Sequence, residues 1–218
     1  MDEKNPVHYE SLIIVRKTRR EDIDELVQVA KAGYGSPTMG PTHEKYESHL
    51  TIFPEGQLCV EYDGKLIGSC SSLIVNIEDY GKNHTFNEIA DGGYIRNHNP
   101  TGRYLYGIDV VVHPDYRHMK VGQHLYKARR NICQKLNLQS IAFGGRMPNY
   151  HRYADQMTAE EYVNQVIKQN IYDPVVNFHI KNGFKFKHIL KNYIPKDNES
   201  LGHATFMEWK NPKYMPKL

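Results

Sequence analysis

The sequence is poor in cysteine, has no long apolar run and carries no large excess of charge of either sign. Its three cysteines, Cys59, Cys70 and Cys133, are an odd number with no pair at metal-ligand spacing, so neither a disulfide framework nor a zinc site is expected. Each lies among apolar residues, which predicts buried free thiols. Unpaired thiols favour a reducing compartment, and we therefore expect a cytoplasmic protein.

Charge and hydropathy exclude two further classes of protein. The 28 Lys and Arg residues nearly balance the 25 Asp and Glu residues, and the net charge of +3 comes without a long basic run, which argues against a nucleic-acid partner. No stretch reaches the length of a membrane span, and the first residues lack the apolar segment of a signal peptide. The 218 residues are expected to form one globular domain over 1–218, with a core over about 12–210. The sequence does not decide whether the protein is a monomer or an oligomer such as a homodimer.

Strand and helix patterns are interspersed along the chain. Runs of β-branched and aromatic residues predict strands, and apolar residues at three- and four-residue spacing predict helices. The expected strands are 12–15, 58–62, 65–77, 104–112, 140–145, 184–194 and 203–209, and the expected helices are 22–32, 42–50, 121–136, one that follows Thr158 and one that begins at 173–174. This order predicts an α/β fold around one sheet.

The spacing of side chains adds detail to three of these helices. Thr18 with Glu21, and Thr158 with Glu161, have the spacing of a capping box at a helix N-terminus. The helix over 121–136 is expected to bury one face formed by Leu125, Ala128, Ile132 and Leu136.

Two excursions, 78–103 and 146–172, are longer than ordinary connections. Each is interpreted as a functional flap or as a tolerated surface insertion. In the second one, Tyr150, His151, Tyr153 and Asp155 could line an acceptor site, although a surface insertion is the simpler interpretation.

The stretch 104–125 has the pattern of a strand that leads through a basic loop into a helix. Proline stops the strand at His113-Pro114 because it has no amide hydrogen for a ladder. Arg117 and Gly122 follow in the loop, just before the helix. The free N–H groups and the dipole of a helix N-terminus attract anions, so this loop predicts a phosphate site for which a pyrophosphate is the natural ligand. An ordinary strand-to-helix connection with solvated charges is the alternative.

The spacing Arg117-x-x-Lys120-x-Gly122 resembles motif A of the GNAT superfamily of N-acetyltransferases, in which Arg or Gln is followed by two residues, Gly, one residue and Gly or Ala. The sequence departs from this motif at Lys120, where the first glycine is usual. A lysine keeps the site positive but does not easily adopt a backbone angle that favours glycine. The Walker loop and the Rossmann glycine pattern are both absent. The element order is also similar to that of the GNAT superfamily, and it implies a mixed, mostly antiparallel sheet flanked by helices.

Two other segments extend the resemblance. Gly183-Phe184 ends a helix as in the superfamily, with His179 in place of the usual tyrosine. The segments 144–155 and 171–175 are similar to acetyltransferase modules joined to carbon–nitrogen hydrolase domains in bacteria, so the chain is expected to be a stand-alone relative or an excised module of that kind.

The resemblance implies acetyl-CoA as co-substrate and no metal. The backbone of Val110, Val111 and Val112 would pair with the pantetheine arm, and the following loop would bind the pyrophosphate. The implied cofactor-binding residues of the loop and of the later helix are Arg117, His118, Met119, Lys120, Val121, Gly122, Gln123 and Asn177.

Acyl transfer to an amine also needs a base and an acid. Asp109 is the acidic residue of the central strand, and its apolar surroundings favour a base or an anchor for a substrate cation. A hydrogen bond to a backbone turn or to a buried arginine is the structural alternative. Tyr106 stands where some family members have a carboxylate and could orient a water. His179 could protonate the leaving thiolate, or it could be a satisfied polar group.

The leading functional hypothesis is therefore transfer of an acetyl group from acetyl-CoA to the primary amine of a small molecule or peptide. A non-catalytic CoA-binding or regulatory module is the alternative, because Lys120 and His179 both depart from the catalytic pattern. A nucleic-acid-binding domain is the least favoured hypothesis.

Overall fold

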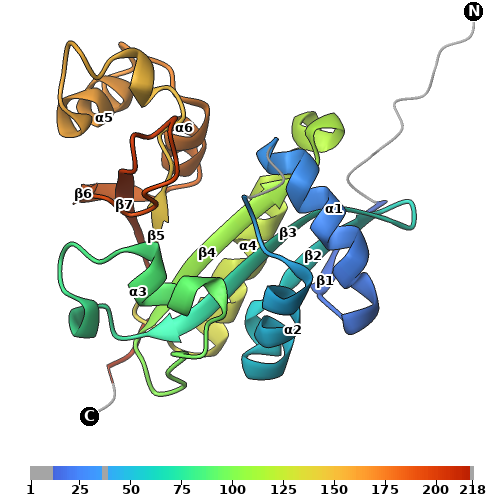
Figure 1. The fold of residues 1–218 in the computed structure, drawn as a ribbon. Coiled ribbons are helices and arrows are strands. Elements are labelled where there is room, and N and C mark those ends of the chain that lie inside the picture. Colours follow the sequence, from blue (N-terminus) through green and yellow to red (C-terminus); the bar gives the residue numbers. More distant parts are fainter. Residues whose placement is uncertain (1–11, 36–38, 217–218) are drawn as a thin grey trace, which may run out of the picture. The chain divides into compact units, whose positions relative to one another are not determined.

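A computed structural model describes residues 12–35 and 39–216. Seven strands are hydrogen-bonded in the order β1-β2-β3-β4-β5-β7-β6 (Figure 1). β1 pairs with β2, β2 with β3, β5 with β7 and β6 with β7 in antiparallel fashion, whereas β4 pairs with β5 in parallel. The expected mixed, mostly antiparallel α/β sheet flanked by helices is confirmed.

The elements follow the expected order closely. The strands are β1 (Ile13–Lys17), β2 (Leu58–Tyr62), β3 (Lys65–Val75), β4 (Tyr104–Val112), β5 (Ser140–Gly145), β6 (Lys185–Leu190) and β7 (Ala204–Lys210). The α-helices of the described residues are α1 (Ile23–Tyr34), α2 (His43–Ile52), α3 (Phe86–Ala90), α4 (Val121–Lys135), α5 (Ala159–Ile167) and α6 (Pro174–Lys181). β6 is shorter than expected, and α3 lies in the excursion 78–103.

The chain divides into two compact units, which are described separately. The first unit comprises residues up to Ser71 together with 109–129. Its helix α1 buries apolar residues at helical spacing, and the Val111 side chain of β4 packs against Val29 and Ala30 of α1. In Figure 1, α1 and α2 lie on one side of the strands of this unit and α4 begins on the other side. The end of β4 is therefore packed against α1, and α4 follows on the opposite side of the strands.

The expected capping box of Thr18 and Glu21 is wrong. A 3₁₀ turn, Arg20–Asp22, precedes α1, and the carboxylate of Asp22 accepts the Arg19 N–H at 2.7 Å. Asp22 also accepts two hydrogen bonds from the Arg16 guanidinium, at 2.6 and 2.9 Å. This bidentate pair holds Asp22 and moves the capping position by one residue.

The second unit comprises residues 72–108 and 130–218. Within it, the parallel pairing of β4 with β5 joins Tyr104–Tyr106 to Ser140–Ala142, and β5 pairs with β7 along its whole length. The excursion 146–172 carries α5, whose capping box of Thr158 and Glu161 is confirmed. This excursion packs against α6 in a small core formed by Met147, Tyr150, Ala159, Tyr162, Val163, Val166 and Val176.

The buried face of α4 differs from the expected one. Leu136 lies just beyond the helix and is 39% exposed, whereas Arg129 is only 1% exposed. The fully buried side chains of α4 are those of Val121, Leu125, Tyr126, Arg129 and Cys133, and four of them recur at four-residue spacing. The expected apolar face did not include Arg129, and the observed buried face is rotated toward this residue.

The three cysteine thiols are buried and free, as expected. Burial raises the pKa of Cys70 to about 11 and the pKa of Cys59 and Cys133 to about 12. None of the helices described by the structure is long and apolar enough to cross a membrane.

Candidate acyl-CoA site

The predicted phosphate loop lies in the first unit, between β4 and α4. A 3₁₀ helix, Pro114–Met119, follows His113, and Lys120 has φ 58° and ψ 21° immediately before α4. This is the left-handed region in which glycine is usual and other residues are strained. Lys120 nevertheless adopts this conformation, although it is not a glycine.

The start of α4 has the features of an anion site. The Lys120 carbonyl accepts hydrogen bonds from the N–H groups of Gln123 at 2.8 Å and of His124 at 3.3 Å, so the helix begins directly after the loop. The first N–H groups of any α-helix lack intrahelical acceptors. No acidic side chain lies in the first turn of α4, so none in that turn neutralises the positive end of the helix dipole.

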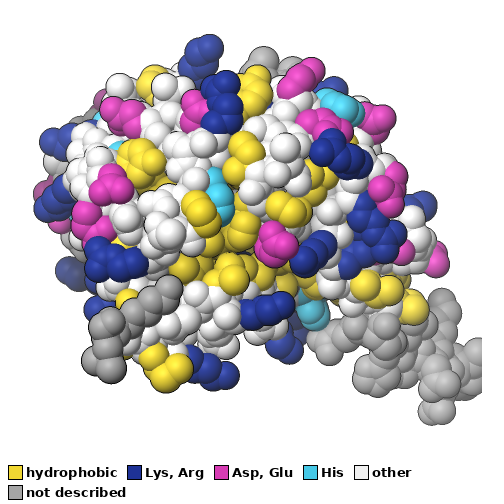
Figure 2. All heavy atoms as spheres, turned by 90° about the horizontal axis from the view of Figure 1, so that it is seen from below, with side chains coloured by type: hydrophobic (Ala, Val, Ile, Leu, Met, Phe, Trp, Pro, Cys, Tyr) yellow, Lys and Arg dark blue, Asp and Glu magenta, His cyan; other side chains and the backbone are white. Residues whose placement is uncertain are grey.

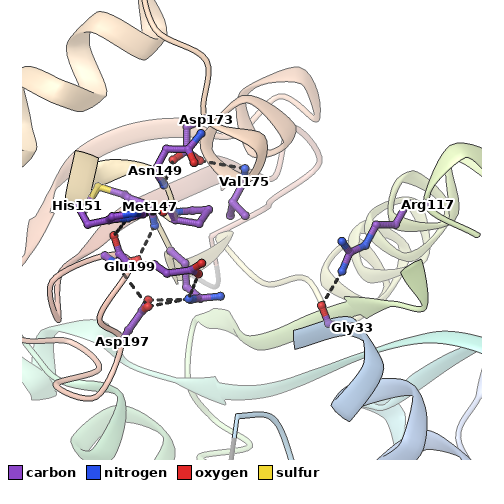
Figure 3. Close-up of polar contacts among 12 residues, drawn as sticks. Gly33, Arg117, Met147, Asn149, His151, Asp173, Val175, Asp197 and Glu199 are labelled. Carbon is purple, nitrogen blue, oxygen red and sulfur yellow. Dashed lines mark hydrogen bonds and ion pairs between the residues drawn. The ribbon is translucent and has the colours of Figure 1, made fainter. Parts of the chain in front are cut away.

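Arg117 contacts the end of α1. Its Nη2 donates to the Gly33 carbonyl at 2.6 Å (Figure 3), and a helix C-terminus attracts cations. A Cβ on Gly33 would lie 2.2 Å from a methyl carbon of Val111, so glycine allows the close approach of α1 to β4. The same contact fixes the direction of the Arg117 side chain.

We expect opposite effects from two substitutions of Lys120. The left-handed conformation costs a non-glycine residue about 1–2 kcal/mol, so Lys120→Gly should keep or raise the melting temperature. Lys120→Val should lower it, because β-branched residues are genuine outliers in this region. Thermal melting of both variants measures the effect, and a valine variant as stable as the wild type would contradict the assigned backbone.

Asp109, in the first unit, interacts with the backbone of β3. Its Oδ1 accepts the Ser71 N–H at 2.8 Å, and its buried Oδ2 has no hydrogen-bond partner among the described residues. Burial raises the pKa of Asp109 to about 6, although Arg129 and Ser71 act in the opposite direction. The carboxyl group therefore titrates close to neutral pH, in the range that suits a general base.

Tyr106, in the second unit, is fully buried, and its hydroxyl is part of a hydrogen-bonded chain of side chains. Its hydroxyl oxygen lies 3.0 Å from Nε2 of His84 and 3.0 Å from the hydroxyl oxygen of Tyr193. Nδ1 of His84 lies 3.1 Å from the Gly81 carbonyl. Gly144 leaves room for Tyr193, since a Cβ there would lie 2.3 Å from the tyrosine ring.

The direction of each hydrogen bond in this chain follows from its ends. A carbonyl only accepts, so Nδ1 of His84 carries the proton, and burial lowers the pKa of His84, which favours the neutral ring. Nε2 must then accept from the Tyr106 hydroxyl, and Tyr106 accepts from Tyr193. The Tyr106 hydroxyl is thus held by two buried partners.

His179 and Asn177 lie on α6 in the second unit. The His179 ring is 7% exposed and packs 4.6 Å from the Phe143 ring, and a Cβ on Gly145 would lie 3.0 Å from its Nε2. The Asn177 side-chain oxygen accepts the Asp173 N–H at 2.8 Å, while Asp173 caps α6 through Val175 and Val176. Asn177 thus takes part in capping the helix.

The start of the excursion 146–172 is fixed by ionic and polar contacts within the second unit. Arg146 donates to Asp197 at 2.6 and 2.7 Å and to Glu199 at 2.7 Å. The buried Asp173 accepts the Asn149 N–H at 3.1 Å (Figure 3). Tyr150 is buried against the Tyr162 ring at 5.4 Å. This part of the excursion is a packed structure.

The structure thus places the predicted residues in two groups. Asp109, Val110–Val112 and the loop 117–123 belong to the first unit, and Tyr106, Asn177 and His179 to the second. Sequence reasoning missed His84 and Tyr193, which contact Tyr106 across separations of 22 and 87 residues. It also missed Arg129, for which the four-residue spacing of the buried face of α4 was the available signal.

Charges are mixed on the molecular surface. On the face drawn in Figure 2, Lys and Arg side chains alternate with Asp and Glu side chains around an apolar area. The side chains visible on this face form no basic stripe of the kind that nucleic-acid-binding domains present.

Comparison with known proteins identifies relatives of the whole chain. It is 49% identical over 210 residues to the "Probable hydrolase YhcX" of Bacillus subtilis (strain 168), covering 96% of this chain and 40% of the relative. It is 34% identical over 205 residues to the "Uncharacterized N-acetyltransferase YkwB" of the same organism, covering 93% of this chain and 90% of the relative. The chain therefore spans less than half of the first relative and most of the second.

Fold and family comparisons agree. The structure resembles the "GphF GNAT-like decarboxylase in complex with isobutyryl-CoA" with a TM-score of 0.79 at 20% identity, covering 91% of this chain and 99% of the other. The sequence profile of the acetyltransferase (GNAT) family matches residues 23–154. A match over more than half of the chain, together with the 34% identity to YkwB over most of both chains, shows that the chain belongs to the acetyltransferase (GNAT) family.

Proposed function

We propose that the protein transfers the acetyl group of acetyl-CoA to a primary amine of a small molecule or peptide in the cytoplasm. The observation that carries the proposal is the loop before α4, in which Lys120 takes the left-handed conformation and the first turn of the helix lacks acidic residues. Membership of the GNAT family and the 34% identity to YkwB, named an N-acetyltransferase, support the same reaction.

In this proposal the donor is bound through the backbone. The pyrophosphate contacts the N–H groups of the loop 117–123, with Arg117 and Lys120 supplying positive charge. The pantetheine arm lies along Val110–Val112, whose valine side chains are free to pack while the backbone binds. Asn177 is assigned to the donor site through the family resemblance.

The proposed chemistry divides the proton transfers between two side chains. Asp109 acts in its charged form, as the base for the amine or as the anchor of a substrate cation, and its pKa of about 6 leaves it mostly ionised at neutral pH. His179 protonates the departing thiolate. Tyr106, whose hydroxyl is held by His84 and Tyr193, orients a water.

Thermal melting with and without acetyl-CoA tests the donor, because a ligand that binds the native state raises the melting temperature by mass action. A clear rise, followed by release of CoA thiol with one member of an amine panel, is the expected result. Binding without thiol release from any amine would favour a non-catalytic CoA-binding module. The absence of any shift at millimolar acetyl-CoA would refute the donor assignment.

Asp109→Asn is expected to lower kcat by about 100-fold or more, the usual size of a general-base contribution. The amide is nearly isosteric and can still accept the Ser71 N–H, so the acetyl-CoA melting shift should stay as in the wild type. In the wild type, kcat should fall as the pH drops through about 6, because Asp109 is then protonated. Equal turnover of the variant and the wild type between pH 5 and 8 would remove Asp109 from the mechanism.

A further inference from the structure

Side-chain hydrogen bonds link one residue pair of β3 and β4 in the first unit, Ser71 and Asp109. In an antiparallel ladder, pairs that exchange two backbone hydrogen bonds recur at every second residue. The His113 N–H donates to the Ile67 carbonyl at 2.9 Å. Counting from this pair places Ser71 opposite Asp109, in a position where both residues should exchange backbone hydrogen bonds.

Two side chains bind the backbone of this pair. The Ser71 N–H donates to the carboxylate of Asp109 at 2.8 Å. Nη2 of Arg129 donates to the Ser71 carbonyl at 2.9 Å and to the Asp109 carbonyl at 2.6 Å. Three backbone groups of the pair are therefore bound by a carboxylate from β4 and a guanidinium from α4.

Arg129 is an unusual residue for this position. It is 1% exposed, its guanidinium lies 5.7 Å from the centre of the Tyr126 ring, and its Nε has no hydrogen-bond partner among the described residues. A buried cation is costly unless a countercharge lies near it. Asp109 is that countercharge, since its pKa responds to Arg129.

Two titratable groups that interact with Asp109 stay neutral near pH 7. They are Tyr46 of α2 and Cys70 of β3, and burial raises the pKa of both groups. Ser71 faces Asp109 as an uncharged donor. Among the described residues, Arg129 of α4 is the cation that lowers the pKa of this carboxyl group.

We propose that Arg129 is a positioning residue for the acetyl transfer, which acts through Asp109 by fixing the backbone of the Ser71–Asp109 pair and by keeping the carboxylate ionised. This inference rests on the proposed function. One guanidinium that binds both carbonyl groups holds β3 and β4 together at this point, and its charge favours the form of Asp109 that accepts a proton.

The test compares Arg129→Gln and Arg129→Lys with the wild type and with Lys127→Gln, an exposed position two residues earlier on α4 that undergoes the same charge change. The carboxyl group of Asp109 is titrated by ¹³C NMR, and the pH profile of thiol release is measured with acetyl-CoA and an accepted amine. An opposite charge lowers a carboxyl pKa by about 1–3 units, so Arg129→Gln should raise the titration midpoint by about that amount. The acid limb of the profile should move to higher pH by the same amount, while KM for acetyl-CoA stays unchanged.

Arg129→Lys keeps the charge with fewer donors and should restore much of the midpoint, whereas Lys127→Gln should behave as the wild type. If no amine is accepted, the proposed function fails, but the NMR titration still decides the role of Arg129. If Arg129→Gln does not fold, Asp109→Asn/Arg129→Gln should fold better than the single variant, because it removes both buried charges together. The proposal would be overturned if Arg129→Gln folds and its Asp109 titrates as in the wild type. It would also be overturned if Arg129→Gln does not fold and the double variant folds no better.

Discussion

Gly122→Glu is expected to abolish the rise in melting temperature that acetyl-CoA produces. Gly122 is the second residue of α4, and a glutamate there places a side chain and a negative charge against the proposed pyrophosphate position. Gly122 is buried, so the desolvation cost of a charged side chain opposes the stabilisation of about 0.3–1 kcal/mol that an acidic residue gains in the first turn of a helix. The melting temperature of the variant without ligand is therefore measured first, and only the rise that acetyl-CoA adds to it reports binding.

Two matched variants separate charge from volume at this position. Asn131→Glu adds the same charge at an exposed position of α4 about nine residues farther along the helix, which at 1.5 Å per residue is roughly 13 Å away, and it should bind acetyl-CoA as the wild type does. Gly122→Ala adds volume without charge and should weaken binding less than glutamate does. A Gly122→Glu protein that melts normally and still responds fully to acetyl-CoA would show that the loop does not bind the donor.

Tyr106→Phe is expected to cost about 2–4 kcal/mol of unfolding free energy, because each buried polar group left without a partner costs about 1–3 kcal/mol. The substitution removes the hydroxyl that lies 3.0 Å from His84 and 3.0 Å from Tyr193. Both partners are buried, and water cannot readily replace the lost hydroxyl. Chemical denaturation at neutral pH measures the loss.

The control for this variant is Tyr80→Phe. The Tyr80 hydroxyl accepts from Asn97 at 2.6 Å, and its ring packs edge-on against His84 at 6.5 Å without joining the buried chain. We expect Tyr80→Phe to cost about 1 kcal/mol, the value of one ordinary hydrogen bond. In the double variant Tyr106→Phe/His84→Leu, the loss should be smaller than the sum of the single losses, because the ring nitrogen without a partner is also removed. Additive losses would contradict the hydrogen-bonded chain.

The sequence was sufficient to predict features that depend on near neighbours. Strand β4 was predicted with its correct bounds because β-branched and aromatic residues continue to His113-Pro114. The capping box of Thr158 and Glu161 also depends on spacing within a few residues. Hydrophobic pattern and local capping chemistry decide such features without help from the rest of the fold.

Features that depend on distant parts of the chain were not predictable in this way. His84 lies in a polar excursion, and its role depends on contacts with Tyr106 and Tyr193 that only the fold creates. Arg129 was not among the residues expected on the buried face of α4, because a buried arginine needs a partner that the local sequence does not show. The left-handed backbone of Lys120 was also not expected from the sequence. This conformation costs a non-glycine residue about 1–2 kcal/mol, and the packing of the adjoining strand and helix offsets a cost of this size.

The three buried thiols have a practical consequence for enzymology and spectroscopy. Thiol reagents react with the thiolate, and the raised pKa values of Cys59, Cys70 and Cys133 leave very little thiolate at neutral pH. Disulfide reagents should therefore report free CoA against a low protein background, without any cysteine substitution. A cysteine introduced at an exposed position should be labelled selectively in the otherwise unmodified chain.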